Sequence, residues 1–154
     1  MPVPYADLLL LHLLAAAFWV GGMALMHFGV RPAAVATLEP AQRLPFLAAT
    51  LARFFAGVSS AIGLLLATGF GMVWLAGGFA NVRWHVHAML AIGLVMTAIY
   101  LHIRLAPFVR LKRAVAARAW PVAAAQLDTI RRLVAVNLLL GVVVFALAVL
   151  GRAL

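Results

Sequence analysis

The chain has 154 residues, of which 68% are hydrophobic and only 10% are charged. A soluble domain carries about 25% charged residues, so this chain lacks the polar surface of a soluble globule. It contains no cysteine, which excludes a disulfide-stapled secreted domain, thiolate metal sites and thiol redox chemistry. The composition therefore predicts a small protein that crosses a membrane several times.

The net charge of +9 comes from 12 lysines and arginines against three acidic residues. In a soluble protein such a balance suggests nucleic acid. Here the basic residues lie between apolar runs, and no solvated surface remains to hold a duplex. We expect no nucleic-acid partner, and we interpret the basic residues as groups that orient the chain in the lipid bilayer and meet anionic headgroups.

Four apolar stretches follow one another along the chain, at about 6–30, 54–79, 84–108 and 133–150. Each reaches or approaches the ~20 residues that cross the hydrocarbon core as a helix. Helices are the expected form because lipid offers no hydrogen-bond partner to an open backbone. The sequence thus predicts an all-α fold, a four-transmembrane-helix bundle that forms a single transmembrane domain over residues 1–154.

The connections after the first and third spans are basic and amphipathic. Pro32 is expected to end the first span and Pro107 to end or kink the third, since proline disfavours the helical conformation of the residue before it. We expect the segments 33–53 and 110–132 to hold short amphipathic helices that lie at the membrane interface.

Ten of the 12 basic residues lie in these two connections or at the adjoining span ends, whereas the other side has only Arg83 and Arg152. The positive-inside rule then places both basic connections in the cytoplasm and both termini in the periplasm of a bacterial-type inner membrane. Spans one and three consequently run in the same direction.

All five histidines lie inside or at the ends of spans one and three. Ionisable residues in spans are costly, and their default interpretation is functional. His12 and His27 are 15 residues apart, as are His87 and His102, which corresponds to ~22 Å along a helix. His12 is therefore predicted at the depth of His87 near the outer face, and His27 at the depth of His102 near the inner face.

Two helices that present imidazoles at one depth can supply the two axial ligands of a b-type haem. The spacing predicts one haem b between His12 and His87, and it leaves open a second between His27 and His102. His85 is the alternative to His87. The two residues lie ~200° apart around a helix, so at most one of them should face the bundle.

Two further features of the spans suit a flat cofactor. Trp19 is expected to pack on the porphyrin. Span two carries a stripe of small residues at intervals of four, which lets helices approach closely or lets a cofactor lie against the backbone. The stripe consists of Ser59, Gly63, Ala67 and Gly71.

Copper is the alternative cofactor. Histidine and methionine are ligands that suit copper, and the spans hold five methionines as well as the histidines. These methionines are Met23, Met26, Met72, Met89 and Met96. A third interpretation, a structural membrane subunit, would use the histidines only as interfacial anchors. The sequence assigns no catalytic residue.

The segment 11–23, in which His12 precedes Trp19-Val20-Gly21-Gly22 by seven residues, resembles the first span of CopD-like (copper resistance D) membrane proteins. It is similar, more distantly, to the start of the HemJ-type protoporphyrinogen oxidases. The likeness continues through the small-residue second span, the Trp84-His85-Val86-His87 motif and the basic run that follows span three.

The CopD resemblance implies copper uptake or resistance and carries over His12, Trp19, Gly21 and Gly22, together with His87. The HemJ resemblance implies a haem-binding membrane oxidoreductase. This chain departs from the HemJ pattern because it has no lysine after the histidine at the start of span three.

Together these features lead us to expect a membrane-embedded b-type haem protein for electron transfer, with a quinone, a porphyrin or another membrane redox partner. Copper binding or copper transport by the same histidines, and a structural subunit, remain the alternatives. The small-residue stripe also predicts a homodimer.

Overall fold

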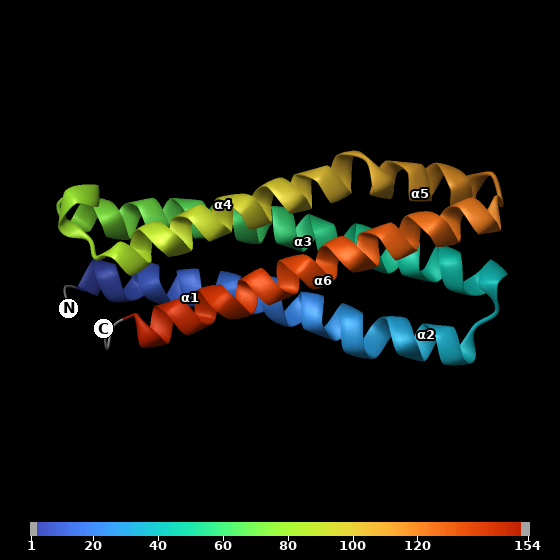
Figure 1. The fold of residues 1–154 in the computed structure, drawn as a ribbon, viewed down its shortest axis with the longest axis horizontal. Coiled ribbons are helices and arrows are strands. Elements are labelled where there is room, and N and C mark those ends of the chain that lie inside the picture. The colour runs from blue at the N-terminus through green and yellow to red at the C-terminus, as the bar shows by residue number, and fades with distance from the viewer. Residues whose placement is uncertain (1–2, 152–154) are drawn as a thin grey trace.

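The structure, a computed structural model, describes residues 3–151 as a bundle of four long rods that run alternately up and down (Figure 1). The first rod consists of α1 (Val3–Leu25), the short π-helix η1 (Met26–Val30) and α2 (Arg31–Thr37), and the second is α3 (Pro40–Leu75). The third consists of α4 (Trp84–Leu105) and α5 (Pro107–Ala116), and the fourth is α6 (Trp120–Leu150). All four are long and apolar enough to cross a membrane, which confirms the all-α four-helix membrane bundle.

The two ends of the bundle differ in what they contain. Figure 1 shows the N- and C-termini at one end, together with the α3–α4 connection that holds the 3₁₀ turn η2 (Phe79–Asn81). We call this the terminal end. The α2–α3 and α5–α6 connections lie at the opposite end, which we call the basic end. This arrangement confirms that the first and third rods run in the same direction. Arg152 lies outside the described residues.

The rods extend further at the basic end than the predicted spans. Contrary to the expectation, Pro32 does not end the first rod, which continues past it as α2. The wider π turn accommodates a residue that has no N–H, and the Arg31 N–H reaches back to the Met26 carbonyl. The first predicted interfacial segment, 33–53, is observed as the end of α2, a break at residues 38–39 and the first part of α3. The second forms α5 and the first part of α6.

Prolines mark the starts of the later helices. Pro40 and Pro107 each occupy the first turn of a helix, where a missing N–H costs nothing. The residue before each proline is non-helical: Glu39 is extended, and Ala106 has φ −115° and ψ −82°. Pro107 thus separates α4 from α5, as the sequence predicted.

The buried core lies mainly from the middle of the bundle to the basic end. There α1 packs on α3, and α6 packs on both α4 and α5. Aromatic rings form its centre: Phe55 contacts Tyr100 and Phe108 edge-on, with ring centroids 5.7 and 5.0 Å apart, and Trp19 contacts Tyr100. The Tyr100 hydroxyl donates to the Phe55 carbonyl over 2.8 Å and so ties α4 to α3.

Candidate metal site in the terminal half

A cavity of about 340 Å³ occupies the terminal half of the bundle and is lined by residues of all four rods. We call it the terminal cavity. It exists because α1 packs mainly on α3 and α4 mainly on α6, whereas α1 and α4 hardly contact one another. Gly69, Gly93 and Gly141 line it. A side chain at Gly93 would meet open space, whereas Gly69 and Gly141 are covered by the side chains of His12 and Val20.

His12 on α1 lines this cavity. Its Nδ1 lies 2.9 Å from the hydroxyl oxygen of Thr68 on α3, and that hydroxyl also lies 2.6 Å from the Leu64 carbonyl oxygen. A carbonyl can only accept, so the Thr68 hydrogen belongs to Leu64, and Thr68 accepts the N–H of His12. The imidazole is thereby held as the Nδ1–H tautomer, which leaves a lone pair on Nε2. Histidines that bind metals are oriented in this way by an outer partner.

His85 on α4 lines the same cavity and is 7% exposed. Its Nδ1 is buried and has no hydrogen-bond partner among the described residues. A buried polar atom without a partner is rare and calls for an explanation, such as water or an ion. Gly151 packs closely against this residue, and an added Cβ there would lie 2.7 Å from the His85 Cβ.

The structure brings His85 rather than His87 to the cavity that contains His12. His87 is exposed, and its Nδ1 lies 3.4 Å from the Arg83 carbonyl of its own helix turn. The two residues lie on opposite sides of α4, in agreement with the expectation that at most one of them faces the bundle. The pairing of His12 with His87 therefore has no basis in the geometry.

The inner pair, His27 and His102, is not brought together. His27 lies in η1 and faces a shallow groove between the first rod, α3 and α6, whereas His102 is exposed on α4. The geometry offers no second cofactor site of the kind the 15-residue spacing suggested. The spacing gives the separation of two histidines along a helix but not the direction in which each side chain points.

Among the other predicted site residues, Trp19 lines the terminal cavity, but Gly63 and Ala67 do not. Both lie on the exposed surface of α3, and no atom lies within 4 Å of the place where a Gly63 Cβ would be. Gly69 lies on the cavity side instead. The predicted homodimer through this small-residue stripe stays a prediction.

Three methionines complete the polarizable groups of the terminal cavity: Met72 on α3, and Met89 and Met96 on α4. The sequence places them in the spans but does not show which face of each helix they occupy. A useful signal was present, because Met89 and Met96 follow His85 by four and eleven residues, close to one face of a helix. No group of three or more histidine, aspartate or glutamate residues that could hold a metal ion occurs within residues 3–151. Besides the two imidazoles, the three thioethers are the soft metal ligands that line this cavity.

The family model described as Copper resistance protein D matches residues 48–150, about two thirds of the chain. The chain belongs to this family, in agreement with the resemblance given above. The match covers α4 with His85 and all three methionines of the cavity, whereas His12 lies before it. Neither a curated protein nor a solved structure matches the chain. The protein is thus a multi-pass membrane protein of a copper-resistance family.

Proposed function

We propose that this protein binds copper in the terminal cavity and handles it at the membrane as its substrate. The observation that carries the proposal is the shared position of His12 and His85, which line one cavity from two rods together with three methionines. The family description points to the same metal. Copper thereby takes precedence over haem, which the spacing of the histidines alone had favoured.

The donor set suits copper better than the harder cations. Thioethers and imidazoles select Cu(I), whereas magnesium, calcium and manganese prefer carboxylate and carbonyl oxygens. None of the described residues that line the cavity is a carboxylate. Methionine is flexible and polarizable, so Met72, Met89 and Met96 can follow an ion as it moves within the cavity.

Different residues of the chain offer ligands to the metal and close the bundle beside the cavity. Thr68 orients His12 and keeps its Nε2 lone pair available, and His85 offers a buried Nδ1 that has no partner among the described residues. Below the cavity, the buried rings of Trp19, Tyr100 and Phe55 close the bundle toward the basic end. A copper ion that enters the terminal half is therefore retained there, because its passage to the basic end would require these rings to move.

The test is a Cu(I) competition titration of the purified protein against a colorimetric chelator. His12→Ala and His85→Ala should each lower the affinity by more than the about 10–100-fold that loss of an outer partner costs. His87→Ala is the matched control, since it removes an exposed imidazole two residues away, and it should bind like the wild type. Wild-type affinity in both His12→Ala and His85→Ala would overturn the proposal.

A haem b held by His12 and His85 is the second candidate. Its support is the pair of imidazoles on one cavity together with the open space beside Gly93. The same samples decide between the two cofactors. A Soret band that sharpens on reduction and is lost in His85→Ala, but not in His87→Ala, would favour haem. A colourless protein that takes up stoichiometric copper would favour the first proposal.

We further propose that the terminal end faces the periplasm of a bacterial-type inner membrane, so that the cavity takes its copper from that side. The support is the concentration of basic residues at the opposite end. Because the chain has no cysteine, single substitutions report unambiguously. An impermeant thiol reagent applied to intact cells should label Ala80→Cys in the α3–α4 connection but not Ala117→Cys between α5 and α6. The reverse pattern would overturn the orientation.

A further inference from the structure

A small groove at the basic end combines charge with apolar walls. It measures about 40 Å³, lies between the first rod, α3 and α6, and shares no lining residue with the terminal cavity. We call it the basic groove. Its basic members are His27, Arg31 and Arg131. The opposing walls are apolar and include Leu47 and Leu51 of α3 and Ile130 and Val134 of α6.

The local backbone explains why His27 and Arg31 face the groove together. They are four residues apart, and the π turn of η1 lies between them. Residues four apart lie on nearly one face of an α-helix, and they do so in the wider π turn as well. The Pro32 that follows cannot donate a hydrogen bond, and the widened turn accommodates this. Such single π turns are frequent at functional sites.

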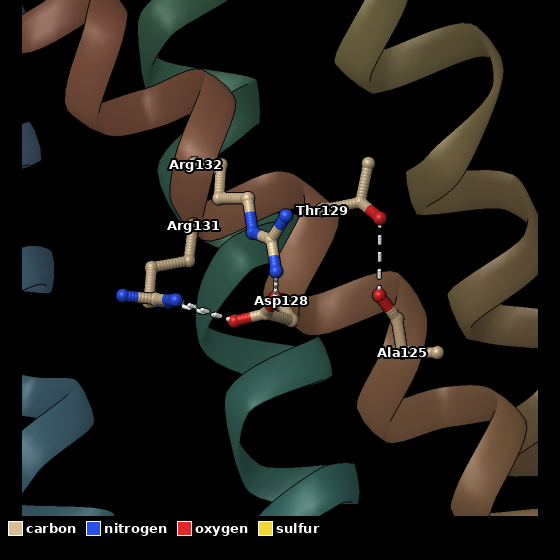
Figure 2. A network of polar contacts seen from close by, with 5 residues as sticks. All are labelled: Ala125, Asp128, Thr129, Arg131 and Arg132. Carbon is tan, nitrogen blue, oxygen red and sulfur yellow. Dashed lines mark hydrogen bonds and ion pairs between the residues drawn. The ribbon is translucent and has the colours of Figure 1, made fainter.

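Arg131 is held in position by Asp128, as Figure 2 shows. Its Nε and Nη2 donate to Asp128 Oδ1 over 2.9 and 2.7 Å, and Arg132 reaches Oδ2 of the same carboxylate over 2.8 Å. Two arginines thus share one carboxylate, which leaves one positive charge uncompensated. In Figure 2 Arg131 approaches Asp128 from the left, on the side of the blue ribbon of the first rod, whereas Arg132 reaches Asp128 from above.

We propose that the basic groove binds an anionic phospholipid of the leaflet at the basic end. Arg31 and Arg131 receive the phosphate from two different rods, and the walls around Leu51 and Ile130 receive the first part of an acyl chain. Arginine suits this task because its planar fork binds phosphate oxygens in pairs. Basic pockets between transmembrane helices are sites of this kind. A free phosphate would leave the apolar walls unused, so the lipid is the occupant the groove fits.

The experiment compares two doubly substituted proteins in delipidated detergent solution. Arg31→Gln with Arg131→Gln removes both cations of the basic groove. Arg110→Gln with Arg113→Gln removes the same charge from exposed positions of α5 at the same end, away from Asp128. Phosphatidylglycerol retained per protein is measured by native mass spectrometry, with phosphatidylcholine as the neutral lipid.

The groove variant should bind phosphatidylglycerol at least about tenfold more weakly than the wild type, because charge-assisted hydrogen bonds are the strong ones. The control variant should bind like the wild type, and phosphatidylcholine should show no difference among the three proteins. Equal losses in both variants would mean unspecific attraction and would overturn the proposal. Displacement of the lipid by inorganic phosphate at equal concentration would also overturn the proposal, because it would show that the apolar walls contribute nothing to the affinity.

A conservative variant guards against misfolding. Arg31→Lys with Arg131→Lys keeps both charges but lacks the paired donors. It should show a melting temperature in phosphatidylcholine like that of the wild type and an intermediate affinity for phosphatidylglycerol. Wild-type affinity in this variant would show that charge alone suffices and would overturn the assigned bidentate contacts. Copper binding in the terminal cavity should be unchanged in all of these variants, so the outcome is independent of the proposed function.

Discussion

The two halves of the bundle consist of similar apolar residues but differ in how tightly these residues pack. In the half toward the basic end, large side chains interlock: Phe55, Leu111 and Ile103 are at most 2% exposed. In the terminal half, the same four rods enclose a cavity of about 340 Å³ with two imidazoles on its walls. The difference teaches that apolar composition alone does not produce a filled core. Packing at one end holds the rods in place, and this permits the other end to remain hollow.

The largest effect is expected on the free energy of unfolding, when one phenylalanine from each half of the bundle is replaced by alanine. Phe55→Ala should lower the free energy of unfolding by about 3–5 kcal/mol, because it leaves a void among closely packed rings. Phe145→Ala, on the wall of the terminal cavity, should cost clearly less, since that side chain already borders open space. Unfolding in mixed detergent micelles measures both. Equal losses would show that the two halves are packed alike.

Next in size is the support that Thr68 gives to His12. Thr68→Val removes the acceptor for the His12 Nδ1–H while keeping the shape of the side chain. We expect the Cu(I) affinity to fall about 10–100-fold, as is typical for the loss of an outer partner.

Thr97→Val is the matched control for this change, because Thr97 lines the same cavity but donates only to the Gly93 carbonyl of its own helix. Its Cu(I) affinity should equal that of the wild type. Similar affinities in Thr68→Val and Thr97→Val would mean that the orientation of His12 does not matter for the metal.

A third comparison uses two glycines of the terminal half. A Cβ at Gly141 would lie 2.8 Å from Cγ2 of Val20, so Gly141→Ala should cost about 1–3 kcal/mol of stability. No atom lies within 4 Å of a Cβ at Gly93, and Gly93→Ala should be neutral or stabilising by up to about 1 kcal/mol through its helix propensity. Melting temperatures in detergent would distinguish these signs. Destabilisation by Gly93→Ala would show that the cavity wall is more tightly filled than described.

The smallest effects concern the polar contacts at the junction of the two halves. Tyr100→Phe loses the bond to the Phe55 carbonyl and the 2.6 Å hydrogen bond with the Ser59 hydroxyl, and it should cost at least about 0.6–1.7 kcal/mol, the value for one interhelical hydrogen bond in a membrane. Asn137→Leu removes the bond from Nδ2 to the Met96 carbonyl, but it also removes a buried Oδ1 that has no partner among the described residues. These two terms oppose one another, so Asn137→Leu should cost less than Tyr100→Phe when both are unfolded in the same micelles.

The residues of the candidate site show what a linear pattern can and cannot supply. The positions of His12, His85 and His87 along the chain place all three in the terminal half, because helical rise depends only on the count of residues. Whether His85 or His87 faces inward depends on how α4 is rotated against α6, and no count of residues fixes that rotation. The same reason explains why Gly63 and Ala67 were expected on the cavity wall, where Gly69 lies.

By itself the sequence determined that the chain is helical, that it forms four spans and that the first and third run in the same direction. Apolar length and the need of every backbone group for a partner leave no other solution in lipid. Only the tertiary structure decided which imidazoles share a cavity, that the methionines join them, and that Arg31 and Arg131 meet at one groove. These facts depend on the rotation and splay of packed rods, which arise from side-chain contacts between segments far apart in the chain.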